Sequence, residues 1–253
     1  MNDFSDAFIA AFSLLIQLDA DLVEIVALSL TVSLTAVLSA AVIGMPLGAA
    51  LAIGSFPGRR MLIIAINSLM GLPPVVVGLV VYLMLSRSGP LGVLGLLFTP
   101  TAMVIAQLIL VMPIIAALTR QVVEVLWAEY EEQLRSLGAT RWRALPTLLM
   151  DGRSQLLTAL LAGFGRAIAE VGAVMIVGGN IDHATRVMTT SIALEVSKGD
   201  LALALGLGIM LVLIAVAVNG LSWLIGSPGQ DRLLRSKRGG GYGRQQYPAA
   251  RTR

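Results

Sequence analysis

The chain has 253 residues, of which 57% are hydrophobic and 13% are charged, and its formal net charge is +3. Soluble domains usually carry about 25% charged residues, so this composition excludes an ordinary soluble domain. The absence of cysteine excludes disulfides and thiolate metal sites, and a single histidine cannot bind a metal alone, so we predict no metal site.

Five apolar stretches are long enough to cross a membrane, since a spanning helix needs about 20 mostly apolar residues. They are residues 23–53, 61–85, 101–126, 156–178 and 201–225. The runs are continuously apolar and do not alternate, which favours helices over barrel strands. The sequence therefore predicts an all-α polytopic membrane protein with five transmembrane helices. Six is the alternative, because residues 8–18 are apolar but too short to span.

We expect three parts along the chain. Residues 1–22 form an extracytoplasmic or interfacial segment, residues 23–227 form the membrane domain, and residues 228–253 form a disordered, basic cytoplasmic tail. A polar segment at 127–152 lies between the third and fourth spans. Placing the N-terminus outside puts most Lys and Arg residues on the cytoplasmic side, as the positive-inside rule requires.

Three predicted spans contain prolines that interrupt helical hydrogen bonding: Pro46, the Pro73-Pro74 pair and Pro113. In a membrane such breaks occur where helices pack or where water enters. Each break is therefore either a packing kink or part of a translocation path, and the sequence does not decide between the two.

The fourth span contains an ionisable pair, Arg166 and Glu170. Their i,i+4 spacing places both on one helix face, and charges at membrane depth need a partner or a wet cavity. The pair either neutralises itself or offers the positive potential of Arg166 to an anion.

The polar segment contains the run EEQLRSLGATRWR at 131–143, with charges of both signs and one Trp. Gly138 tolerates backbone angles that other residues avoid and so can connect two short helices. Trp142 and Arg141 are residue types favoured in interfaces. The segment is predicted either to contact another protein or to lie on the lipid headgroups.

This segment resembles the coupling loop of ABC importer permeases, summarised as E-A-A-x-x-x-G followed by nine residues and I-x-L-P. Glu132-Gln133-Leu134 corresponds to E-A-A, and Gly138 lies six residues after Glu132. Ala139 and Trp142 match common choices, Leu148 corresponds to the Ile, and Met150-Asp151 replaces the usual Leu-Pro.

Within that family, the chain resembles the molybdate, tungstate and sulfate branch. Residues 72–78 (LPPVVVG) and 163–173 (GFGRAIAEVGA) are similar to that branch, with Ala169 where Gly is common. Residues 174–181 and 185–195 look most like tungstate permeases. The resemblance implies a type I ABC importer permease fold that works as a homodimer in a prokaryotic cell membrane.

The resemblance also implies functional residues and partners. The ATPase-coupling residues would be Glu131, Glu132, Leu137, Gly138, Ala139, Arg141 and Trp142. The translocation path would include Arg166, Glu170, Pro73, Pro74, Thr189 and Thr190. We expect no catalytic residue and no cofactor on this chain, with ATP and Mg bound by two copies of a partner ATPase.

An extracytoplasmic oxyanion-binding protein and membrane lipid would be the other partners, with no nucleic acid. The expected cargo is tungstate, and the alternatives are molybdate, sulfate or another small solute. A channel or scaffold that works without an ATPase is the remaining hypothesis.

Overall fold

The computed structural model describes residues 20–218 and residue 220, and every regular element in that part of the chain is a helix. The elements are α2 (Ala20–Ile53), α3 (Arg59–Leu69), α4 (Pro74–Leu85), the 3-10 helix η1 (Gly92–Leu94), α5 (Pro100–Ser136), α6 (Arg141–Asp151), α7 (Arg153–Ile168), α8 (Gly172–Gly178), α9 (Met188–Lys198) and a last helix, Leu201–Val218. The segments predicted at 8–18 and 228–253 lie outside the described residues.

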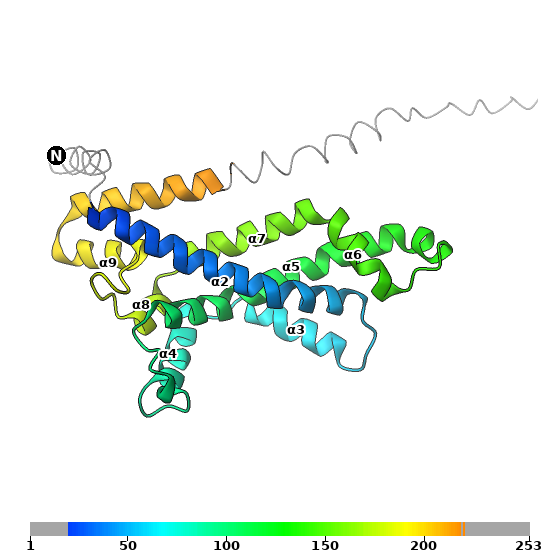
Figure 1. The fold of residues 1–253 in the computed structure, drawn as a ribbon, viewed down its shortest axis with the longest axis horizontal. Coiled ribbons are helices and arrows are strands. Elements are labelled where there is room, and N and C mark those ends of the chain that lie inside the picture. The colour runs from blue at the N-terminus through cyan, green and yellow to red at the C-terminus, as the bar shows by residue number, and fades with distance from the viewer. Residues whose placement is uncertain (1–19, 219, 221–253) are drawn as a thin grey trace, which may run out of the picture.

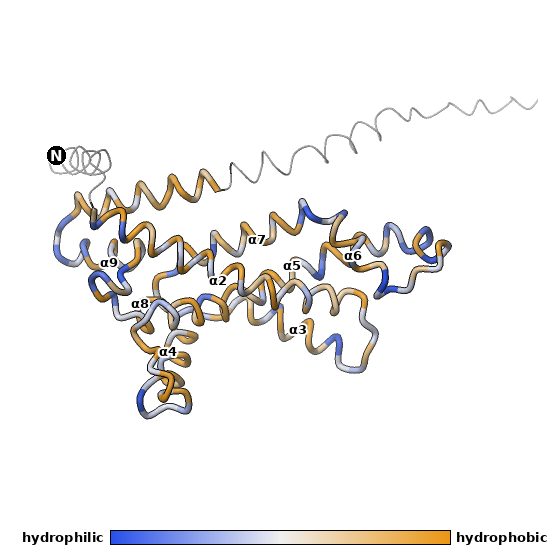
Figure 2. Tube along the Cα trace, viewed as in Figure 1, coloured by the Kyte–Doolittle hydropathy of each residue, from blue (hydrophilic) through white to orange (hydrophobic). Residues whose placement is uncertain are grey.

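The molecule is elongated, and α2, α5 and the last helix run along its length (Figure 1). One end, called here the α6 end, carries α6 and the turn between α2 and α3. The opposite end, called the α9 end, carries α9, the start of α2 and the segment between α8 and α9. Polar residues gather at both ends and the helix bodies between them are apolar (Figure 2), as expected for helices that cross a membrane.

Three helices are long and apolar enough to span a membrane: α2, α5 and Leu201–Val218. Two further candidate spans are each a pair of helices joined at a bend. The bend is 101° between α3 and α4, and 59° between α7 and α8. The described part of the chain thus has three candidate spans, or five if each bent pair counts as one. The all-helical prediction is confirmed.

The prolines differ in their effect. Pro46 and Pro113 lie inside α2 and α5, which continue past them. Pro73 is the N-cap of α4 and Pro74 is its first residue, so the predicted interruption of the second span is present between α3 and α4. The bend between α7 and α8 has no proline and was not predicted.

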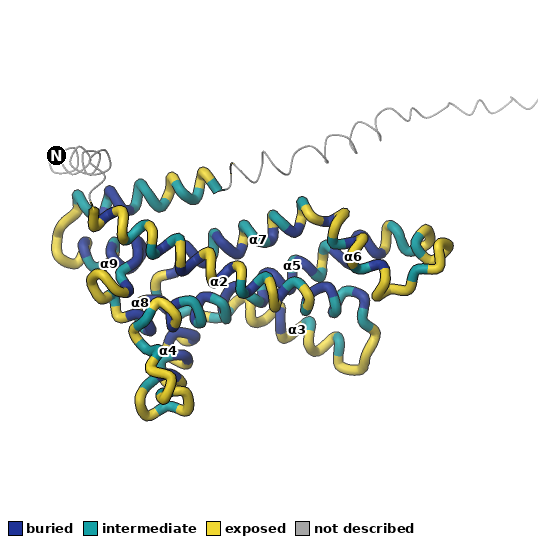
Figure 3. The backbone as a smooth tube through the Cα atoms, in the orientation of Figure 1, coloured by how far each residue is buried: buried dark blue, intermediate teal, exposed yellow. Residues whose placement is uncertain are grey.

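Helices α2 and α5 pack along each other and form the centre of the fold. Glycine on α2 permits their close approach: a Cβ at Gly44 would lie 3.0 Å from the carbonyl oxygen of Met112, and one at Gly48 would overlap the carbonyl of Ala116. Buried apolar residues form successive clusters along the molecule, including one between α6 and the ends of α2 and α5. Exposed positions concentrate at the tips and on outward faces (Figure 3).

Candidate coupling segment and translocation path

The polar segment predicted at 127–152 is a helix–turn–helix and not a loop. Helix α5 continues to Ser136, and Gly138 adopts the left-handed φ of 76°. Its N–H donates to the carbonyl of Arg135, and the next N–H, of Ala139, donates to the carbonyl of Leu134. These two bonds form a Schellman motif, which ends a helix and reverses the chain. Gly138 therefore makes the turn that its residue type predicts.

Helix α6 has two faces. Its N-cap is Thr140, whose hydroxyl accepts a hydrogen bond from the N–H of Arg143. Ala144 and Leu148 are buried against the ends of α2 and α5. The opposite stripe, at i, i+4 and i+8, is Trp142, Pro146 and Met150, and all three are exposed. Because α6 packs against two candidate spanning helices, a displacement of α6 would move both of them.

The charged residues of this segment fall into two groups. Glu131 forms ion pairs with Arg135 and, at 3.6 Å, with Arg141, whose guanidinium carbon lies 5.6 Å from the centroid of the Trp127 ring. These residues hold the start of α6 against α5. Glu132 is exposed and makes no ion pair with any described residue. Of the predicted coupling residues, Glu132, Leu137 and Trp142 present exposed side chains, whereas Glu131 and Arg141 bind within the chain.

A second ionic contact at the α6 end joins α3 to α5. The Arg59 guanidinium donates to the carbonyls of Leu51 and Ala52, which end α2, and to Glu124 at 2.6 Å. Glu124 also pairs with Arg120 one turn earlier on α5. Charge-assisted hydrogen bonds of this kind are the stronger ones. The turn between α2 and α3 is therefore attached to α5.

Glu170 occupies the bend between α7 and α8, and its surroundings explain why the helix is interrupted there. Its side-chain Oε1 accepts a hydrogen bond from the N–H of Ala173, so it caps α8. Its backbone carbonyl accepts a hydrogen bond of 2.7 Å from the hydroxyl of Thr189. The guanidinium of Arg166 lies 3.7 Å from its second carboxylate oxygen. Two backbone groups that the bend releases, the N–H of Ala173 and the carbonyl of Glu170, thus have side-chain partners.

Further buried polar side chains surround this bend. Gln107 on α5 donates to the carbonyl of Ala167 at the end of α7, and Ser29 on α2 accepts from the N–H of Met188. A small cavity of about 10 Å³ is lined by Ser29, Ser33, Gln107, Glu170 and Thr189 among others. Within the described residues, the Oε1 of Gln107 has no hydrogen-bond partner. Sequence reasoning missed this cluster, although a Gln inside an apolar span was a visible signal.

The two helix bends lie next to each other. A Cβ on Gly172, at the start of α8, would lie 2.8 Å from the side chain of Val75 and 3.8 Å from Glu170 Oε1. Pro73 and Pro74 immediately precede Val75 at the start of α4. The start of α4 therefore lies next to the start of α8, and Arg166 and Thr189 contact Glu170 at the same bend. That these residues line a translocation path stays a prediction.

Thr190 and Arg166, the two other features of the predicted path, have contacts and exposure of their own, and their role in the path stays a prediction. The Thr190 hydroxyl donates to Asn180 and accepts from the N–H of Val187, so it fixes the start of α9. The Arg166 side chain is 40% exposed whereas that of Glu170 is 6% exposed. The Arg166 side chain therefore lies at the surface of the single chain and is partly exposed to its surroundings.

Comparison with known families identifies the chain. The model of the family described as "Binding-protein-dependent transport system inner membrane component" matches residues 44–226. The chain belongs to this family. The predicted relationship to ABC importer permeases is confirmed.

Similar proteins include the tungstate uptake system permease of Peptoclostridium acidaminophilum, 42% identical over 89% of this chain and 99% of that protein. A probable anion ABC transporter permease of Haloferax volcanii is 42% identical over 71% of this chain and 80% of that protein. The sulfate transport system permease of Escherichia coli is 30% identical over 57% of this chain and 55% of that protein.

Membership has three consequences. The chain is a multi-pass membrane component of a transport system, its family implies a substrate-binding protein and an ATPase as partners, and its relatives are permease subunits. In this permease, the predicted roles of the path and coupling residues named above can be tested by substitution.

Glu170→Ala is expected to lower the free energy of unfolding by about 1 kcal/mol or more, because it removes the cap of α8 and leaves Arg166 without its carboxylate. Glu170→Gln retains an oxygen that can accept from Ala173, so it should lose less. Thermal unfolding in detergent compares the two. Equal losses would mean that the ion pair, and not the cap, is the main contribution.

Proposed function

We propose that this permease carries tungstate inward as the membrane subunit of an ATP-driven importer. The observation that carries this proposal is the 42% identity to a tungstate uptake permease, which extends over 99% of that protein. Likeness to a sulfate permease is weaker and covers about half of that protein, so sulfate is the alternative cargo that a relative supports.

The proposed orientation puts the α6 end in the cytoplasm and the α9 end outside. Arg59, Arg60, Arg135, Arg141 and Arg143 lie in or next to the α2–α3 turn and the α5–α6 segment, at the α6 end. The α9 end carries fewer basic residues and several carboxylates. This asymmetry agrees with the positive-inside rule.

Each of two ATPase subunits would bind the exposed stripe of α6 on one copy of the chain. Trp142 is 60% exposed and Met150 is 71% exposed, on a segment that is too charged to lie in hydrocarbon. An apolar stripe with charged neighbours is typical of a protein interface. ATP and Mg would bind to the ATPase subunits. Closure of these subunits would move α6, and its packing would transmit the movement to α2, α5 and α7.

A second copy of the chain would complete the path. A half-exposed guanidinium at membrane depth is costly in lipid, and covering by a homodimer partner would enclose Arg166 next to a wet axis. The cluster at the two bends would then line the route of the oxyanion, which an extracytoplasmic binding protein delivers. Selectivity would reside mainly in that binding protein.

Uptake of tungsten tests the cargo. Cells without other oxyanion permeases, but with this chain, its ATPase and a tungstate-binding protein, should accumulate tungsten in the presence of a large excess of sulfate, as measured by mass spectrometry. Molybdate in the same excess measures the discrimination between the two metal oxyanions. Accumulation of sulfate in place of tungstate would refute the cargo assignment.

Trp142→Ala should weaken binding of the ATPase by about 30-fold, the effect of losing an interface residue that contributes about 2 kcal/mol. Phe56→Ala is the matched control, because Phe56 is an aromatic residue of the α2–α3 turn and is 45% exposed. Co-purification and titration of the ATPase measure both. If the wild-type chain captures no ATPase, the channel or scaffold hypothesis replaces the importer.

Arg166→Ala should lower tungstate uptake at least about tenfold, since charged hydrogen bonds contribute about 1.5–3 kcal/mol. Arg87→Ala, which removes an exposed charge at the end of α4, should leave uptake near that of the wild type. Equal uptake by the two variants would remove Arg166 from the path.

A further inference from the structure

A cavity at the α9 end lies outside the proposed path and coupling segment. It has a volume of about 230 Å³ and is bounded by the start of α2, the segment between α8 and α9, and the residues that follow α9. Its charged lining residues are Asp21, Glu24, Asp182, His183, Arg186, Glu195 and Asp200. Carboxylates outnumber cationic groups, so the cavity favours a cation.

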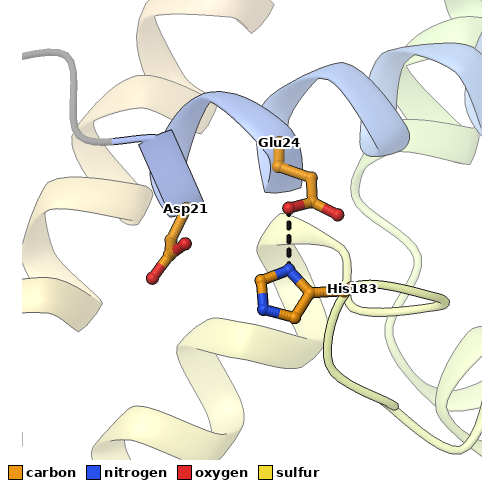
Figure 4. A group of neighbouring side chains, drawn as sticks. All are labelled: Asp21, Glu24 and His183. Carbon is orange, nitrogen blue, oxygen red and sulfur yellow. Dashed lines mark hydrogen bonds and ion pairs between the residues drawn. The ribbon is translucent and has the colours of Figure 1, made fainter.

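Three of these residues have their ligand atoms together. One donor atom each from Asp21, Glu24 and His183 lies within 4.8 Å of the others, and Nδ1 of His183 is 2.9 Å from a Glu24 oxygen. The side chains approach from two elements and face a common space (Figure 4). Of the carboxylates outside this group, Asp182 pairs with Arg186, Glu195 pairs with Lys198, and Asp200 accepts from the N–H of Leu203.

An independent observation indicates a polar occupant. Ser191 lines the same cavity and is 1% exposed, and its hydroxyl has no hydrogen-bond partner among the described residues. A buried hydroxyl without a partner is unusual and calls for a water or an ion. A water or a hydrated cation in this cavity would supply that partner.

We propose that Asp21, Glu24 and His183 form a binding site for a divalent transition-metal cation of the zinc type, which attaches the start of α2 to the segment between α8 and α9. An imidazole with two carboxylates is a ligand set that suits zinc, with water in the fourth position. Ligand atoms around one zinc ion lie about 3–4 Å apart. All three side chains are exposed, so small rotations can bring them to that spacing.

Sequence reasoning predicted no metal site, because His183 was considered alone. Glu24 precedes it by 159 residues, and no local spacing connects the two. The proposal is also independent of the cargo: it concerns a site at the far end of the molecule from α6, and it stands whether or not tungstate is carried.

Protons should compete with the metal. The hydrogen bond to Glu24, followed by the charges of Glu24, Asp182 and Asp21, raises the pKa of His183 above its ordinary value of 6.5. Metal binding requires the neutral imidazole, so protons compete with zinc for His183 and zinc affinity should fall as the pH falls. Arg186, Glu195 and Asp200 also line the cavity, and their charges contribute to the electrostatic potential inside it.

Zinc titration of the purified full-length chain, with an affinity tag that contains no histidine, tests the site. We expect one zinc per chain by calorimetry and weak binding of magnesium. X-ray absorption should detect one imidazole ligand, and because His183 is the only histidine of the chain, that ligand identifies the site. Absence of zinc binding, or zinc without an imidazole ligand, would overturn the proposal.

Matched variants separate coordination from general charge. His183→Asn and Glu24→Gln should each lower zinc affinity at least about tenfold, since loss of even an outer partner of a ligand costs about 10–100-fold. Asn is chosen because His183 has a φ of 52°, a conformation that Asn tolerates. Asp182→Asn removes the same charge from the cavity without removing a proposed ligand and should change affinity by less than about threefold. An equal loss of zinc affinity in Asp182→Asn and Glu24→Gln would show that the negative charge of the cavity attracts zinc without a specific site.

Discussion

The burial of one face of α6 against the ends of α2 and α5 is the contact on which the proposed coupling to an ATPase depends. Ala144 and Leu148 fill that contact, and Gly138 makes the turn that allows it. The opposite face of α6 remains exposed. One short helix is therefore bound to the membrane domain on one side and open to a partner on the other. The Arg59–Glu124 pair extends the same attachment to the start of α3.

A second constraint acts in the middle of the molecule. Bends in membrane helices release backbone groups that lipid cannot satisfy, and here Glu170, Thr189 and Gln107 satisfy those of α7 and α8. The bend at Pro73 lies against the same place. Two bent helix pairs therefore meet at a cluster of hydrogen-bonded polar groups inside the apolar membrane domain.

Local features of the sequence predicted much of this arrangement. Long apolar runs predicted the helices, Pro73-Pro74 predicted one bend, and Gly138 predicted the turn into α6. Prediction failed where the cause lies far along the chain. The bend at Glu170 depends on Thr189 and Ala173, the surroundings of Gln107 depend on Ala167, and Glu24 meets His183 across 159 residues. The ion pairs of Glu131 with Arg135 and Arg141 of its own chain were not predicted either.

Labelling of single cysteines tests the central claim, that the α5–α6 segment is cytoplasmic. The chain has no cysteine, so Ser136→Cys and Ser197→Cys each introduce the only thiol, at exposed positions of the two opposite ends. A membrane-impermeant maleimide is expected to label position 136 only in inverted vesicles and position 197 in intact spheroplasts. Labelling of position 136 in intact spheroplasts would contradict a cytoplasmic α5–α6 segment.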